Sequence, residues 1–190
     1  MPDVAIVGGG TAGLSAALFT AKNGLETAVF DTDETWMHKA HLFNYPGIRS
    51  ISGSEFMTVA RGQVQDRGAD LHMTEEVTAV EETDDGFRIE TADSEYEATY
   101  VVLATGADRS IAEEIGCEFD DEDTVDVNLS METSVENCYA TGAMVRAEEW
   151  QAVIAAGDGG AAALDILSAE KGEHYHDFDT PGDVPTFESE

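Results

Sequence analysis

The chain has 190 residues, of which 40 are Asp or Glu and 9 are Lys or Arg, so its formal net charge is -31. Such a charge repels nucleic acid and anionic membranes. Because the acids run through the apparently folded middle of the chain rather than forming one disordered tail, the charge indicates a halophilic protein whose folding needs salt to screen repulsion. No stretch approaches about 18 consecutive apolar residues and no basic leader segment precedes one, so we expect a cytoplasmic protein without a membrane span or signal peptide.

The first predicted elements are a strand, a helix and a second strand. Residues 3–7 form a short run that is apolar after Asp3, rich in β-branched side chains and followed by consecutive glycines, which predicts a buried strand. Residues 11–23 carry apolar side chains at helical spacing and stop at Gly24, and residues 26–31 have the composition of a strand. This βαβ unit predicts parallel strands joined by a right-handed crossover.

The rest of the chain predicts further strands and two more helices. In chain order the predicted elements are a loop over 32–52, a helix over 53–68 capped by Ser52 or Ser54, a β-meander of three to four strands over 76–106, a strand over 137–141, a helix over 148–171 and an irregular tail from 172 onward. The fold class is therefore α/β, with a parallel sheet, helices and a small β-meander.

The glycine turn between the first strand and the first helix fits a dinucleotide-binding fingerprint better than a purely structural turn. Gly8, Gly10 and Gly13 satisfy G-x-G-x-x-G. The first glycine permits the tight turn, the second lets the backbone approach a pyrophosphate, and the third lets helix and strand pack closely. Asp31 ends the second strand, where a carboxylate accepts hydrogen bonds from a ribose. These residues leave the choice between NAD and FAD open.

Four segments together decide between these cofactors. They are the fingerprint at 8–13, HLFNYPG at 41–47, YVVLATGA at 100–107, and TSVENCYATGA at 133–143 followed by WQAVIAAGDGGAAALDIL. In order and context they resemble the FAD half of the thioredoxin reductase-like flavoproteins, a branch of the family with two dinucleotide-binding domains. The resemblance covers nearly the whole chain. It implies a Rossmann-like FAD/NAD(P)-binding fold with one FAD, bound without covalent linkage.

The resemblance also implies which residues contact the FAD. The fingerprint and Asp31 would hold the pyrophosphate and the adenosine ribose. The flavin ring would lie beside residues 44–47 and the start of the last helix, whose positive dipole end suits the charge of a reduced flavin. The implied cofactor-binding residues are Gly8, Gly10, Thr11, Ala12, Gly13, Asp31, Asn44, Pro46, Gly47, Val77, Ala104, Thr105, Gly106, Gly142, Ala143, Gln151 and Ala152.

Two features depart from the family pattern. The last family motif closes with Gly-Asp, whose carboxylate accepts hydrogen bonds from the ribityl chain, whereas this chain has Gly142-Ala143. Loss of such a bond costs about 1.5–3 kcal/mol. The family also inserts an NAD(P)H domain with a C-x-x-C after the Ala-Thr-Gly strand, and here that insertion is missing after about residue 108. We therefore expect one FAD-binding domain over 1–171 and an acidic tail over 172–190.

The cysteines and two histidines add no defined site. Cys117 and Cys138 lie in apolar contexts without C-x-x-C or metal-ligand spacing, which predicts buried structural thiols and no metal centre. His38 and His41 lie in the loop expected to approach the flavin. They are candidates for proton transfer and equally for hydrogen bonding at the surface.

The sequence therefore predicts an FAD-dependent oxidoreductase or electron-transfer protein that receives reducing equivalents from a redox partner protein or a diffusing donor. The alternatives are a non-catalytic nucleotide-binding protein with a relaxed flavin site, and an NAD(H)-binding module. Because the resembling family pairs through its FAD domains, a homodimer is also expected. The sequence identifies no catalytic residue.

The net charge predicts that folding weakens as ionic strength falls. Below about 0.1 M salt the Debye length exceeds about 10 Å, so repulsion between neighbouring carboxylates is no longer screened. Far-UV circular dichroism, recorded while the protein is dialysed from molar salt into dilute buffer, should lose helical signal that returns when salt is restored. A spectrum that stays constant in dilute buffer would contradict the prediction.

Overall fold

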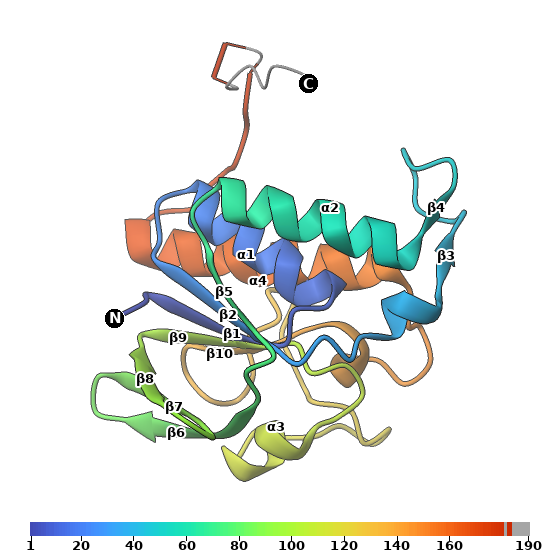
Figure 1. Ribbon diagram of the computed structural model, residues 1–190. Helices are drawn as coiled ribbons and strands as arrows, with labels where there is room; N and C mark the ends of the chain where they lie inside the picture. The colour runs from blue at the N-terminus through green and yellow to red at the C-terminus, as the bar shows by residue number, and fades with distance from the viewer. Residues whose placement is uncertain (181, 184–190) are drawn as a thin grey trace.

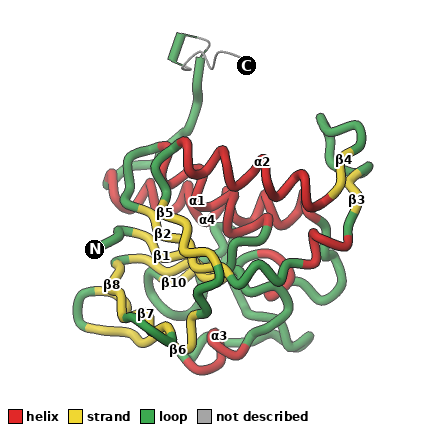
Figure 2. Tube along the Cα trace, viewed as in Figure 1, coloured by secondary structure: helices red, strands yellow, loops and turns green. Residues whose placement is uncertain are grey.

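The computed structural model describes residues 1–180 and 182–183 and contains a parallel sheet between two covering layers (Figure 1; Figure 2). Its order is β10-β9-β1-β2-β5, and all four pairings are parallel. The strands are β1 (Val4–Val7), β2 (Thr27–Asp31), β5 (Asp70–Met73), β9 (Tyr100–Leu103) and β10 (Cys138–Ala140). The chain leaves β1 toward β2 and later returns to the other side as β9. The order therefore reverses between β1 and β9, the kind of position where open α/β sheets bind ligands.

Three helices cover one face of the sheet, and an antiparallel meander covers the other (Figure 1). The helices are α1 (Thr11–Lys22), α2 (Gly53–Asp66) and α4 (Ala152–Lys171). The opposite layer contains β6 (Val77–Thr83), β7 (Gly86–Thr91), β8 (Glu95–Ala98) and the short α3 (Ser110–Glu114). The remaining elements are the 3-10 helices η1 (Trp36–Lys39) and η2 (Gly142–Val145) and the strand pair β3 (His41–Leu42) and β4 (Ile51–Ser52).

The alternation of side chains along the central strands builds two cores. On β1, Val4 and Ile6 belong to the cluster that packs against the helices, whereas Ala5 and Val7 belong to the cluster under the meander. Every residue of β1 and β9 is buried. Because both faces of the sheet are covered, the strands are continuous apolar runs, which is the pattern that the sequence shows.

The predicted helix over 53–68 and the small meander are confirmed. Ser52 is the helix cap, because its Oγ accepts a hydrogen bond from the Glu55 N–H at 3.2 Å. The fourth strand of the predicted meander region, β9, joins the parallel sheet instead and pairs with β1.

The last helix begins later than predicted, at Ala152 rather than at Glu148. The Trp150 N–H bonds to the Glu148 carbonyl at 2.8 Å, and Gln151 adopts an extended conformation with ψ of 139°. Residues 148–151 therefore form a turn that precedes the helix. The periodicity of apolar residues in the sequence cannot distinguish such a turn from an extra turn of helix.

Helix α4 packs on α1 through a glycine contact. A Cβ added to Gly159 would lie 2.0 Å from the Ala12 carbonyl oxygen, so only glycine allows this approach. Among the described residues, α4 is the one helix long and apolar enough by composition to cross a membrane. Its contact with α1 and its buried Asp158 and Ile166 are the features of a core helix.

The predicted tail contains no helix or strand as far as residue 180, and it packs back on the helices. Lys22 Nζ lies 2.8 Å from a carboxylate oxygen of Asp177 and also pairs with Asp179. The Tyr175 N–H donates to Ser168 Oγ at 3.0 Å. The rest of the predicted tail, apart from 182–183, lies outside the described residues.

The α1–α4 contact predicts opposite effects for two alanine substitutions in the same helix. Gly159→Ala should lower the free energy of unfolding by about 1–3 kcal/mol, because the added methyl overlaps the backbone of α1. Gly157→Ala meets nothing within 4 Å, so higher helix propensity should raise stability by about 0.5–1 kcal/mol. Urea unfolding in molar salt measures both. Equal effects at the two positions would show that the close approach is not needed.

Candidate cofactor-binding site

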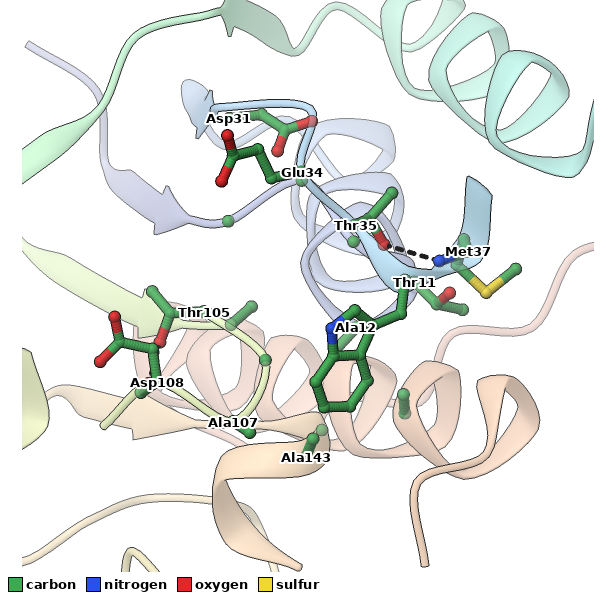
Figure 3. Close-up of a pocket in the computed structure, with 18 of the residues that line it drawn as sticks. Thr11, Ala12, Asp31, Glu34, Thr35, Met37, Thr105, Ala107, Asp108 and Ala143 are labelled. Carbon is green, nitrogen blue, oxygen red and sulfur yellow. Dashed lines mark hydrogen bonds between the residues drawn. The ribbon is translucent and has the colours of Figure 1, made fainter. Parts of the chain in front are cut away.

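The carboxyl ends of β1, β2 and β9 open onto a cavity of about 1120 Å³ (Figure 3). Pockets for drug-sized ligands span about 300–1,000 Å³, so this one has room for a dinucleotide. Figure 3 shows Asp31 and Glu34 at one edge, Thr11 and Ala12 at the start of α1, and Thr105 on the loop across the cavity. The fingerprint and the Ala-Thr-Gly loop therefore meet in one place.

The fingerprint glycines divide into packing and open positions. A Cβ on Gly8, whose φ is +106°, would lie 2.3 Å from the Ala104 carbonyl oxygen, and one on Gly13 would lie 1.9 Å from the Gly8 oxygen. A Cβ on Gly10 would meet only Thr35 Oγ1 at 3.7 Å. Gly8 and Gly13 thus hold strand, loop and helix together, whereas Gly10 leaves free space at the cavity wall for a ligand to approach the backbone.

Two helix N-termini face this cavity without a side-chain cap. Gly10 precedes α1 and Gln151 precedes α4; neither makes a side-chain cap hydrogen bond, and neither helix has an acid in its first turn. By contrast, α2 is capped by Ser52 and carries Glu55 in its first turn. Uncapped N–H groups and the positive dipole end form a site for anions, so the residues present fit a pyrophosphate cofactor.

Asp31 is held by a network of charged groups at the end of β2. Its carboxylate is buried and accepts a hydrogen bond from Arg61 Nη2 at 2.9 Å and from the Asp33 N–H at 3.2 Å. Asp33 in turn lies 2.7 Å from His38 Nε2, and hydrogen bonds from His38 and Arg61 hold the pKa of Asp33 below its usual value. A carboxylate with two oxygens still has lone pairs for a ribose, so the predicted role of Asp31 is compatible with the network.

The two candidate histidines have different positions. His38 bonds to Asp33 and Ser54 and is absent from the cavity lining, so it stabilises the turn after β2. His41 lines the cavity, bonds to Ser50 Oγ at 2.8 Å and stacks on Phe43 with ring centroids 4.5 Å apart. Of the two, only His41 is placed to contact a bound ligand.

Most of the predicted contact residues line the cavity. Those that do are Gly8, Gly10, Thr11, Ala12, Asp31, Asn44, Val77, Ala104, Thr105, Gly106, Gly142, Ala143, Gln151 and Ala152. Gly13 packs helix against strand instead, and Pro46 and Gly47 lie in a turn outside the lining, closed by a hydrogen bond from the Ile48 N–H to the Tyr45 oxygen. Trp36 and Trp150 also line the cavity, and no motif in the sequence predicts their position there.

The position where the family pattern has an aspartate carries no polar side chain here. Ala143 lies in η2 and lines the cavity, and its carbonyl accepts a hydrogen bond from Arg109 Nη2 at 3.3 Å. Arg109 Nε also donates to the Met144 carbonyl at 2.9 Å, so this arginine stabilises the backbone of η2. On the loop after β9, Asp108 also lines the cavity (Figure 3), and its carboxylate accepts hydrogen bonds from Ser110 that lower its pKa.

The two cysteines are buried and free, as predicted, and their thiols interact with each other. The hydrogen bond between their thiols lowers the pKa of Cys117 to about 7 and, together with burial, raises that of Cys138. They pack in the core between the sheet and the meander and do not line the cavity.

Comparisons with known proteins identify the family and the cofactor. Residues 46–160 match the family model described as pyridine nucleotide-disulphide oxidoreductase, and residues 3–41 match the FAD binding domain model. Over 116 residues the chain is 40% identical to a thioredoxin reductase of Treponema pallidum, a match that covers 56% of this chain and 36% of that relative. The chain thus spans about a third of the length of the curated relatives that it matches, such as the thioredoxin reductases of Treponema pallidum and Mycolicibacterium smegmatis. FAD as the cofactor is confirmed by the match to the FAD binding domain model.

Solved structures share the fold. A thioredoxin reductase from Gloeobacter violaceus superposes with a TM-score of 0.85 at 20% identity, covering 94% of this chain and 99% of that chain. A ferredoxin-flavin thioredoxin reductase from Clostridium acetobutylicum superposes with a TM-score of 0.79 at 18% identity, covering 90% and 99%. The predicted Rossmann-like fold is confirmed, and so is the resemblance to thioredoxin reductase-like flavoproteins.

The free space at Gly10 predicts a variant that folds but does not bind. Gly10→Val should leave the melting temperature nearly unchanged, because its Cβ meets only Thr35 Oγ1 at 3.7 Å. The side chain should occupy the path of the pyrophosphate and weaken FAD binding by at least about 100-fold, or about 2.7 kcal/mol. Spectral titration with FAD in molar salt measures the affinity. Gly62→Val, in α2 with nothing within 4 Å, is the matched control and should bind as wild type.

If Gly10→Val retained wild-type affinity with an intact fold, the pyrophosphate would have to lie elsewhere. A variant that fails to fold would instead contradict the open space at this position, and circular dichroism separates the two outcomes.

Proposed function

The chain belongs to the pyridine nucleotide-disulphide oxidoreductase family, and we propose that it is an FAD-binding oxidoreductase that takes its electrons from an external donor. The strongest support comes from α1 and α4, whose N-termini both lie at one cavity. Neither N-terminus has a side-chain cap or an acid in its first turn, although the chain has 40 acidic residues. Helix α2 does not show this pattern, because the Ser52 side chain caps its N-terminus and Glu55 places a negative charge in its first turn. The absence of acids at these two helix starts is therefore specific to the cavity.

The described residues divide the work of binding in the following way. The N–H groups at the start of α1, beside Gly10, bind the pyrophosphate, and Asp31 accepts hydrogen bonds from the adenosine ribose. The N-terminus of α4, after Gln151, stabilises negative charge at the edge of the flavin ring. FAD itself would supply the hydride and electron chemistry.

An external donor is proposed because of what lies between β9 and β10. Described residues 104–137 contain only the five-residue α3 and isolated bridges such as Phe119 with Val125. They carry no second G-x-G-x-x-G and no C-x-x-C. A donor that is itself a protein fits the neighbour described as a ferredoxin-flavin thioredoxin reductase. A cytoplasmic location, a halophilic host and a homodimer remain part of the same proposal.

A non-catalytic nucleotide-binding protein is the second candidate. The observation in its favour is Ala143, which removes a ribityl hydrogen bond and turns its carbonyl toward Arg109. Such a protein would bind the adenosine half of FAD about as well as the whole cofactor. The flavin-binding proposal requires FAD to bind much more tightly than ADP.

Reduction kinetics test the external-donor proposal directly. Bound FAD should be bleached promptly by dithionite but only slowly by NADH or NADPH, with a rate that rises linearly with concentration. A positioned nicotinamide is worth about 7–11 kcal/mol of the barrier, and the described residues form no second dinucleotide site. Stopped-flow absorbance at the flavin band measures both rates. Fast bleaching that saturates with NAD(P)H would show a nicotinamide site and overturn the proposal.

A further inference from the structure

The only two tryptophans of the chain meet at one end of the cofactor cavity. Trp36 begins η1 and Trp150 immediately precedes the N-cap of α4, and both line the cavity. Their ring centroids lie 5.2 Å apart with an interplanar angle of 47°. They are 54% and 45% exposed, so each leaves about half of a large apolar surface uncovered. Exposed aromatic surface on a cavity wall is surface that a ligand can bury.

A hydrogen bond holds the Trp150 ring, and a helix cap fixes the backbone turn that carries Trp36. Trp150 Nε1 donates to the Arg146 carbonyl at 3.0 Å, and the Arg146 guanidinium pairs with the buried Asp158 of α4 at 2.6 Å. Thr35 Oγ1 caps η1 by accepting a bond from the Met37 N–H at 3.3 Å, the dashed line in Figure 3. The tryptophan pair is therefore built into the ends of two elements rather than lying on free loops.

A second contact joins the same two segments. Asn44 Nδ2 donates to Gln151 Oε1 at 2.8 Å, so the segments 36–44 and 150–151 are linked both by amides and by indoles. Both amides also line the cavity. This end thus combines an aromatic surface, two side-chain amides and a helix N-terminus.

The two ends of the cavity differ in chemistry. Asp31 with its arginine partner defines one end, which suits the hydroxyl groups of a ribose. The tryptophan pair, with Met37 and Ile154 also on the lining, gives the other end a large apolar surface beside the Asn44 and Gln151 amides. A planar aromatic ring with amide-like edges matches the second end, and an isoalloxazine ring has this chemistry.

We propose that Trp36 and Trp150 form the contact surface for the isoalloxazine ring and hold it against the N-terminus of α4. The proposal rests on the proposed function, because it requires FAD in the cavity with its adenosine at Asp31. The pair covers the ring on the side of residues 36–44 and excludes water from it. The two tryptophans are positioning residues for the flavin rather than catalytic residues.

Tryptophan emission reports on this contact without any label, because no other tryptophan contributes. Addition of FAD in molar salt should quench most of the emission, whereas ADP, which lacks the ring, should leave it nearly unchanged. Binding is measured independently by ultrafiltration and flavin absorbance. Trp150→Ala should weaken FAD binding by about tenfold and ADP binding not at all, whereas Trp150→Phe should stay close to wild type. Phe178→Ala, 73% exposed on the tail, is the control and should change neither.

The outcomes separate this inference from the proposed function. Retained FAD with emission no more quenched than by ADP, or wild-type affinity for both Trp36→Ala and Trp150→Ala, would overturn the tryptophan contact and leave FAD binding intact. Strong quenching of the tryptophan emission by ADP as well as by FAD would place the adenine ring at the pair and would also overturn the inference. A protein that retains no FAD at all would overturn both.

Discussion

The structure depends on two helix N-termini that converge, uncapped, on the carboxyl ends of parallel strands. Each helix leaves N–H groups without an internal partner, and neither α1 nor α4 supplies a side chain to satisfy them. A negatively charged ligand in the cavity would accept hydrogen bonds from the unpaired N–H groups of both helices. The glycine contacts serve the same arrangement, because Gly13 brings α1 onto the loop after β1 and Gly159 brings α4 onto α1. Without these approaches, the two N-termini would not share one cavity.

The charge of the chain makes this arrangement electrostatically demanding. The cavity lining itself carries acids, among them Asp31, Glu34, Asp108, Glu114 and Glu149. In the proposed binding mode the backbone N–H groups attract the pyrophosphate and these carboxylates repel it, and salt screens the repulsion. Salt thus acts on binding as well as on folding. A surface with so few lysines leaves the backbone as the main source of positive potential at the site.

Local pattern predicted much of this molecule, and long-range contact explains the rest. The βαβ unit, the glycine fingerprint and the meander follow from periodicity and turn residues that lie close together in the chain. The late start of α4 could not be predicted, because the turn at 148–151 is as compatible with helix as its neighbours are. The pairing of Cys117 with Cys138 and of Trp36 with Trp150 depends on the fold, since each pair joins segments far apart in sequence. The role of Arg109 at the Ala143 turn could not be predicted either, because the two residues lie far apart in the sequence.

The most direct test of this account is the visible absorption spectrum of the protein after incubation with FAD in molar salt and removal of free flavin. The account predicts a yellow protein with one FAD per chain, because the cavity, the two helix N-termini and Asp31 together fit one dinucleotide. A protein that remains colourless under these conditions, while its circular dichroism shows an intact fold, would contradict it.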